Sequence, residues 1–291
     1  MSILHETFAW ELEPGVWLRG DVRMQAEGET RKPIIVLVHG FKGFKDWGMF
    51  PYAAQRLAGQ EYAVVTFNFS HNGVGAQGVD FDELDKFARN THTLELRDLG
   101  VVMDAIQDGR MPLSHVMDGG RVLLVGHSRG GGDCVLYAAE HGTEVRGIVS
   151  WNGIADCNLF TDEFREQVLQ DGIGYVTNAR TKLRMPITAS FFEDLAINQE
   201  RYHIAKRAAS LQVPALFVQG DADTPRLVAG YHRLQEAAPQ HRYVLLLDAD
   251  HTFGTRHPWS GTTLALEKAI VLTRGFAAGL FERERIGLEM D

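Results

Sequence analysis

The sequence has few cysteines and no long apolar run. Cys134 and Cys157 are its only two cysteines, and neither belongs to a CxxC pair or to a zinc-type Cys/His spacing. A disulfide framework and a structural metal are therefore not expected. No stretch of about 18 uncharged apolar residues occurs, and the N-terminus lacks a basic start followed by an apolar core. Neither membrane insertion nor secretion is expected.

Basic runs are also missing. The formal net charge is -9 and 45% of the 291 residues are hydrophobic. Nucleic-acid binding needs clustered Lys and Arg to neutralise phosphates, so no nucleic-acid partner is expected. The composition predicts a cytoplasmic globular protein with a substantial core, and it leaves a homo-oligomer open.

Short apolar runs alternate with helix-like stretches. Continuous apolar runs predict strands that are buried on both faces of a parallel sheet, at 34–38, 63–69, 122–125, 145–151, 215–218 and 243–247. Helices are predicted at 47–59, 91–107, 128–141, 227–238 and 262–281. Residues 16–24 alternate loosely, as an antiparallel edge strand does. This order predicts a doubly wound, mostly parallel α/β sheet with its function at the carboxyl ends of the strands.

One interval interrupts the alternation. Roughly 55 residues separate two predicted strands between Asp156 and Leu211, well beyond an ordinary connection. This interval includes DEFREQVLQ and NQERYHIAKRAAS, which are typical of helices. We therefore expect a core formed by 1–155 and 212–291, with a helical cap insertion at 156–211.

A glycine-flanked serine lies where an apolar run meets a predicted helix. Gly126-His127-Ser128-Arg129-Gly130 satisfies G-x-S-x-G in the strand-to-helix context that this motif requires. A serine on such a sharp turn is strained, and flanking glycines avoid collisions with the neighbouring strand and helix. Ser128 is thus a candidate nucleophile, which needs a base and an orienting carboxylate.

Candidates for both partners follow later predicted strands. The run at 215–218 leads into Gly220, Asp221 and Asp223, and the run at 243–247 leads into His251. The order Ser, Asp, His is therefore available on successive sheet elements. His257 is a weaker candidate for the base, and either aspartate could be the acid at this point. Asp98 is interpreted as a helix-surface residue without a catalytic role.

With these motifs the chain resembles the α/β-hydrolase superfamily from His39-Gly40 to His251. Its HGF loop is similar to those of cinnamoyl and feruloyl esterase-like, dienelactone hydrolase-like and acylaminoacyl-peptidase-like members. The resemblance implies Asp223, three positions after Gly220, as the acid, with Asp221 as the alternative. It also implies an oxyanion hole formed by the backbone N–H groups of Phe41 and Arg129.

These features predict a serine hydrolase without a metal or organic cofactor. A carboxylesterase acting on a small-molecule ester is favoured over an aminopeptidase, acylpeptidase or thioesterase, and a non-catalytic binding protein of the same fold is the alternative class. The Arg129 side chain is expected to form a structural ion pair, with an anionic substrate as the alternative. Several aromatic residues are candidates for an acyl or aryl pocket, namely Phe41, Phe44, Trp47, Trp151, Phe191 and Phe192. Asp162, Glu163, Glu193 and Asp194 are candidates for binding an amine.

Overall fold

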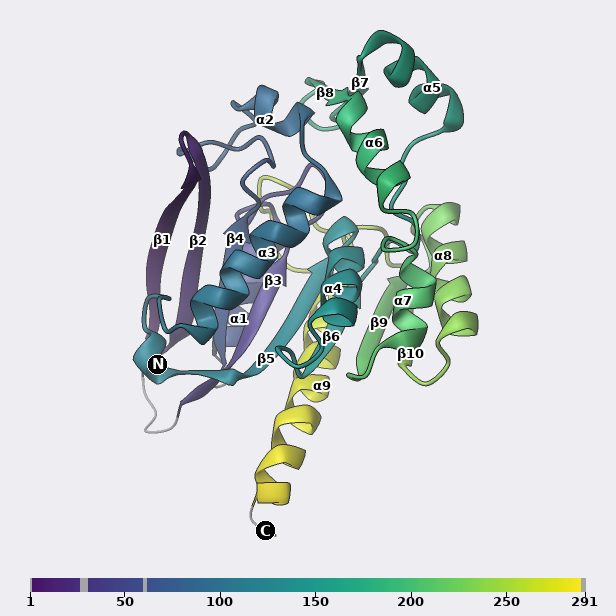
Figure 1. Ribbon diagram of the computed structural model, residues 1–291. Coiled ribbons are helices and arrows are strands. Elements are labelled where there is room, and N and C mark those ends of the chain that lie inside the picture. The colour runs from purple at the N-terminus through teal and green to yellow at the C-terminus, as the bar shows by residue number, and fades with distance from the viewer. Residues whose placement is uncertain (1, 27–30, 60–61, 289–291) are drawn as a thin grey trace.

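An eight-stranded sheet forms the centre of the molecule (Figure 1), with strand order β1-β2-β4-β3-β5-β6-β9-β10. The computed structural model describes residues 2–26, 31–59 and 62–288. The strands of this sheet are β1 (Ile3–Glu13), β2 (Val16–Gln25), β3 (Lys32–Val38), β4 (Ala63–Asn68), β5 (Met117–His127), β6 (Gly147–Trp151), β9 (Ala215–Gly220) and β10 (Arg242–Leu246). All neighbouring pairs from β4 to β10 in this order are parallel, which confirms the predicted mostly parallel sheet.

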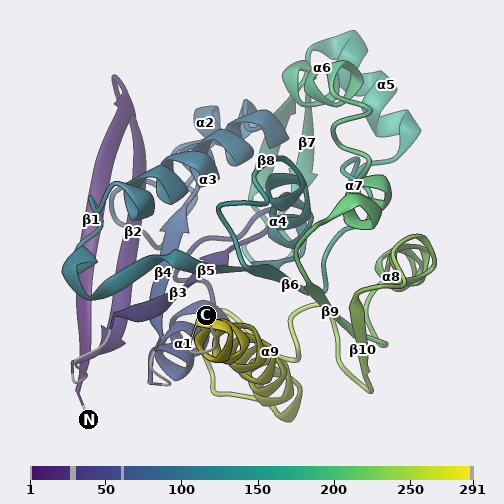
Figure 2. The ribbon, with the colours of Figure 1, turned by 60° about the horizontal axis from the view of Figure 1, so that its bottom comes forward.

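Helices cover both faces of the sheet. The helices are α1 (Met49–Ala58), α2 (Leu84–Ala88), α3 (His92–Gln107), α4 (Arg129–Glu140), α5 (Asp162–Asp171), α6 (Ala189–Ile197), α7 (Ile204–Ser210), α8 (Pro225–Ala237) and α9 (Leu264–Leu288). Figure 2 shows α1 and α9 on one face, with α3, α4 and α8 on the other. Each face has its own apolar cluster. Burial on both sides explains why β3 and β4 are mostly apolar.

The first two strands differ from the sequence-based expectation. Residues 16–24 were predicted to form an edge strand, but β2 lies between β1 and β4 and is antiparallel to both. The edge strand on this side of the sheet is β1, which the apolar pattern did not predict. Most side chains of β1 are exposed or half-buried, so the strand carries no continuous apolar run.

The inserted segment is not entirely helical. It contains α5, α6 and α7, and also an antiparallel hairpin of β7 (Ile173–Thr177) and β8 (Arg184–Thr188). Gly172 ends α5 in a left-handed conformation with φ 77°, which directs the chain into the hairpin. The hairpin and α5 and α6 lie together beside α2 (Figure 1), whereas α7 packs with α4 and α8 in the helical layer over the sheet.

Loops from four parallel strands meet at one edge of the sheet. They follow the carboxyl ends of β3, β5, β9 and β10. In this order the loops carry Phe41, Ser128, Asp223 and His251, the residues predicted for the site. In the part of the chain that the structure describes, no helix has the length and apolar character to cross a membrane.

Candidate active site

Ser128 lies at a sharp turn between β5 and α4. Its backbone has φ 57° and ψ -121°, which is strained for a residue with a side chain. A Cβ on Gly126 would lie 2.1 Å from the Gly130 oxygen, and a Cβ on Gly130 would lie 2.5 Å from the His39 oxygen. Both glycines therefore provide the clearance that the turn requires.

The structure brings Ser128, His251 and Asp223 together. His251 Nε2 lies 2.9 Å from Ser128 Oγ, and His251 Nδ1 lies 2.8 Å from Asp223 Oδ2. Because an ionised carboxylate only accepts, Nδ1 carries the proton and Nε2 is free to accept from the serine hydroxyl. This is the geometry in which a histidine can take the proton of a serine nucleophile.

The alternative acid and base lie outside this chain of hydrogen bonds. The carboxylate of Asp221 accepts from the Asp248 backbone N–H at 2.7 Å. His257 Nδ1 accepts from the Gly48 backbone N–H at 3.0 Å, and its ring stacks on Trp47. Asp221 therefore holds the backbone at Asp248, and His257 holds the backbone at Gly48.

A second layer of hydrogen bonds holds the acid in place. Burial would raise the pKa of Asp223, but the hydrogen bond and charge of His251 outweigh it, together with hydrogen bonds from the Thr224 backbone and Gln219. The pKa of Asp223 therefore lies below its ordinary value, and the group stays ionised. Gln219 Nε2 donates to Asp223 Oδ2 at 3.0 Å.

Asn152 and His127 fix the backbone of the His251 loop. Asn152 Nδ2 donates to the His251 carbonyl at 2.9 Å, and His127 Nε2 donates to the same oxygen at 2.8 Å. Burial lowers the pKa of His127 to about 3, so its ring is neutral. Asn152 was not among the residues predicted from the sequence. The signal for it was its position directly after the last residue of β6.

The loop after β3 passes directly against the turn at Ser128. A Cβ on Gly40 would lie 2.9 Å from Ser128 Cβ and 3.2 Å from the Arg129 backbone nitrogen. Phe41 follows Gly40, so the Phe41 and Arg129 amides come from adjoining backbone segments. Within the described residues, neither of these N–H groups donates a hydrogen bond to a protein acceptor.

The Arg129 side chain forms a buried ion pair. Its Nε lies 2.5 Å from Glu95 Oε2, in the geometry of an ion pair rather than of an aligned hydrogen bond. Its guanidinium also lies 5.3 Å from the ring centre of Phe191 and 5.9 Å from that of Phe41. Of the two roles considered for this side chain, the structure shows the ion pair.

One cluster has the composition of a metal site. Ligand atoms of His92, Glu95 and Asp133 lie within 4.8 Å of one another, and all three residues are buried. Burial raises the pKa of Glu95 to about 7 and that of Asp133 to about 6, against the opposing charge of Arg129. Because the Arg129 guanidinium already supplies the positive charge here, this group does not fit a metal ion.

Asp98 is not the surface residue that the sequence suggested. Its side chain is fully buried, and it accepts a hydrogen bond from the Ser70 backbone N–H at 2.6 Å. It thus anchors the loop after β4. The interpretation as a surface residue was wrong because this partner lies 28 positions away.

Aromatic side chains link the loop after β3 to the inserted segment. The ring of Phe160 lies 5.8 Å from Phe41, 5.3 Å from Phe191 and 5.7 Å from Phe192. Trp151, another pocket candidate, instead lies on the α9 side, where its Nε1 donates to Thr273. We call Phe41, Phe160, Phe191 and Phe192 the aromatic cluster.

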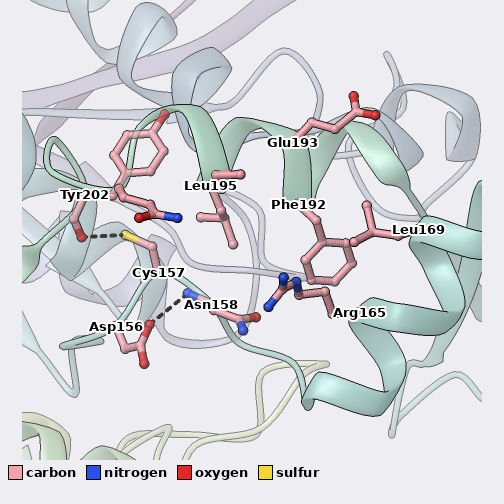
Figure 3. A pocket seen from close by; sticks show the side chains of 11 residues that line it. Asp156, Cys157, Asn158, Arg165, Leu169, Phe192, Glu193, Leu195 and Tyr202 are labelled. Carbon is pink, nitrogen blue, oxygen red and sulfur yellow. Dashed lines mark hydrogen bonds between the residues drawn. The ribbon is translucent and has the colours of Figure 1, made fainter.

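A cavity of about 360 Å³ lies between α5, α6 and the segment after β6 (Figure 3). Cys157, Arg165, Phe192 and Tyr202 contribute to its wall. Ser128, Asp223 and His251 do not line this cavity, so it is separate from the site that these three residues form. Asp194 accepts hydrogen bonds from Thr93 and Tyr202, which makes it a structural residue rather than a free amine ligand.

Comparison with known proteins adds the family. A model of the alpha/beta hydrolase family matches residues 35–277. The chain belongs to this family. The predicted resemblance is thereby confirmed. A search of curated proteins gave no match.

Solved structures share the fold at low sequence identity. Est1E from Butyrivibrio proteoclasticus has 13% identity and a TM-score of 0.67, with 95% of this chain and 99% of that chain covered. A putative dienelactone hydrolase from Klebsiella pneumoniae has 16% identity, a TM-score of 0.61 and coverage of 96% and 99%. A monoacylglycerol lipase from Paleococcus ferrophilus has 15% identity, a TM-score of 0.63 and coverage of 96% and 99%.

Proposed function

We propose that this alpha/beta hydrolase is a serine carboxylesterase whose triad is Ser128, His251 and Asp223. The observation that carries the proposal is the continuous chain of hydrogen bonds from Asp223 through His251 to Ser128 at a strained turn. A serine hydroxyl becomes an effective nucleophile only beside such an oriented base.

In the first half of the reaction, Ser128 Oγ attacks the ester carbonyl while His251 Nε2 takes the hydroxyl proton. Asp223 keeps His251 in the required tautomer and stabilises the imidazolium that forms. Negative charge develops on the carbonyl oxygen, and the Phe41 and Arg129 amides donate to it. Each such donor is typically worth about 2.7 to 4 kcal/mol in acyl-transfer enzymes.

The tetrahedral intermediate then collapses. His251 returns the proton to the leaving alcohol, and an acyl group remains on Ser128. A water molecule gives its proton to His251 and attacks the acyl carbonyl, which releases the carboxylic acid and restores the serine. Every proton transfer therefore passes through the one imidazole nitrogen that faces Ser128.

The aromatic cluster favours an ester with an apolar or aryl group. Phe41 follows Gly40, which packs against Ser128, and the Phe41 ring contacts Phe160 from the inserted segment. Est1E, a structural relative, has been solved with ferulic acid bound. Est1E shares the fold of this chain, and its aromatic ligand is the kind of group that we propose for the ester substrate.

Hydrolysis of a matched substrate panel tests the proposal. We expect turnover of 4-nitrophenyl esters from acetate to octanoate, and much slower turnover of aminoacyl 4-nitroanilides. Ser128→Ala should lower kcat by about 10⁶. Ester activity within tenfold of the unsubstituted protein would place the nucleophile elsewhere. If the folded protein neither hydrolyses esters nor reacts with a fluorophosphonate, it is a binding protein.

A further inference from the structure

Lys42 lies in the loop after β3, directly after the proposed oxyanion donor Phe41. Its backbone has φ 56°, in the left-handed region. For a residue with a side chain this conformation costs about 1 kcal/mol or more, which glycine would avoid. Strain of this kind at a candidate site points to a function for the side chain.

The Lys42 ammonium has no anionic partner in the described part of the chain. Its Nζ lies 5.4 Å from the centre of the Phe41 ring, and no salt bridge joins it to a carboxylate. The side chain is half-buried, and this burial lowers the pKa of the ammonium group. An anion bound beside such a partly desolvated ammonium group would favour its charged form.

Neighbouring cations behave differently. Lys45, in the same loop, lies 2.9 Å from Asp21 and 2.6 Å from Asp46. Arg129 is neutralised by Glu95. Both are structural cations, whereas the charge of Lys42 is left for a ligand.

The backbone of Lys42 lies close to the turn at Ser128. Gly40 packs against Ser128, and Lys42 is two residues further along. Consecutive Cα atoms are about 3.8 Å apart, so the two Cα atoms are separated by at most about 7.6 Å. A lysine side chain from there can meet a group a few bonds from the ester carbonyl.

We propose that Lys42 is a specificity determinant that binds a carboxylate carried by the ester substrate. The inference rests on the proposed esterase function and adds the substrate class, namely esters that carry a second, anionic group. Phe41 would contact the apolar part of the same molecule.

Two pairs of substrates test this inference. For a carboxylate on the acyl side, mono-4-nitrophenyl glutarate is compared with 4-nitrophenyl pentanoate. For a carboxylate on the alcohol side, 4-carboxyphenyl butanoate is compared with 4-carbamoylphenyl butanoate. The readout is the ratio of kcat/KM for the charged ester to that for its neutral counterpart. Variants are Lys42→Met, which removes the charge, and Lys42→Arg, which keeps it.

Lys42→Met should lower this ratio by about 10- to 100-fold in at least one pair of substrates. This is the change in kcat/KM expected when one hydrogen bond to a charged group is lost. Lys42→Arg should restore most of it. Added salt should weaken the preference in the unsubstituted protein and have little effect on Lys42→Met. Lys182→Met is the matched control, because Lys182 also has positive φ, at 60°, but is exposed. It should leave the ratio unchanged.

An unchanged ratio in both pairs for Lys42→Met would overturn the inference. An equal fall for charged and neutral esters would also overturn it, because that is the signature of a structural role. Failure of the esterase proposal looks different, since no ester would then be hydrolysed by the unsubstituted protein and Ser128 would not react with a fluorophosphonate.

Discussion

Arg129 and Glu95 form an ion pair beneath the proposed active site, with Nε and Oε2 2.5 Å apart and both side chains almost completely buried. Removing one partner leaves an uncompensated buried charge, which costs about 3–5 kcal/mol. We expect Arg129→Met to lower the free energy of unfolding by this amount at pH 8, measured by urea denaturation.

A double variant and a second pH value provide controls for this prediction. Arg129→Met/Glu95→Gln should recover part of the lost stability, because the buried Glu95 carboxylate that loses its partner in the single variant is also removed. Burial raises the pKa of Glu95 to about 7, so the loss caused by Arg129→Met should be smaller at pH 6, where Glu95 takes up a proton. Equal destabilisation by the single and double variants would contradict the ion-pair account.

The contrast between Ser128 and Glu95 shows how far the sequence could predict the site. Ser128, Asp223 and His251 each follow an apolar strand, so local pattern and family resemblance were enough to select them. Glu95 pairs with Arg129 because α3 packs on α4, and no local pattern encodes that contact. Pairing partners between helices depend on packing, which a single sequence does not display.

The strands of the fold also differ in whether the sequence predicts them. The almost fully buried strands β3, β4 and β9 were predicted because each contains a continuous apolar run, which indicates a strand buried on both faces. The mostly exposed β1 and the β7–β8 hairpin lack such runs. Their strand structure comes from pairing with a neighbour, which the apolar pattern cannot reveal.

Asp223 and Asp221 should differ sharply when each is changed to asparagine. Asp223→Asn should lower kcat by about 10⁴, because the amide favours the wrong histidine tautomer. Asp221→Asn should cost less than tenfold, since the Asp221 carboxylate accepts from the Asp248 backbone rather than from His251. Steady-state hydrolysis of one 4-nitrophenyl ester measures both. A larger loss for Asp221→Asn would reverse the assignment of the acid.

His39 should make folding sensitive to acid. Its Nε2 accepts from the Phe69 backbone N–H at 3.3 Å, and burial lowers its pKa from 6.5 to about 4. The unfolded chain therefore takes up a proton first, and stability decreases as pH falls from 6.5 towards 4. Each pKa unit corresponds to about 1.4 kcal/mol, so this residue contributes up to about 3 kcal/mol to the loss.

His39 Nδ1 also donates to the Gly40 carbonyl at 3.0 Å. A glutamine can both accept and donate in this way, so His39→Gln can keep both hydrogen bonds without titrating. Between pH 6.5 and pH 4, we expect this variant to lose up to about 3 kcal/mol less unfolding free energy than the unsubstituted protein. Urea denaturation at the two pH values gives the comparison. The same acid-induced loss in both proteins would show that His39 does not titrate in this range.

Gly126 and Gly275 provide a test of the turn at Ser128. Gly126→Ala should reduce both stability and kcat, because the new Cβ would lie 2.1 Å from the Gly130 oxygen. Gly275 lies in α9, and a Cβ added there would meet no neighbouring group within 4 Å, so Gly275→Ala should stabilise the helix by up to about 1 kcal/mol. Thermal unfolding and ester turnover of both variants provide the measurement. Full activity in Gly126→Ala would contradict the steric account.

Covalent labelling shows whether Ser128 is the nucleophile of this protein. After incubation with a fluorophosphonate, intact-mass and peptide mass spectrometry should find one adduct per chain, on Ser128. The adduct should be absent in Ser128→Ala and should form much more slowly in His251→Ala. An adduct on another residue, or none on the folded protein, would contradict the account.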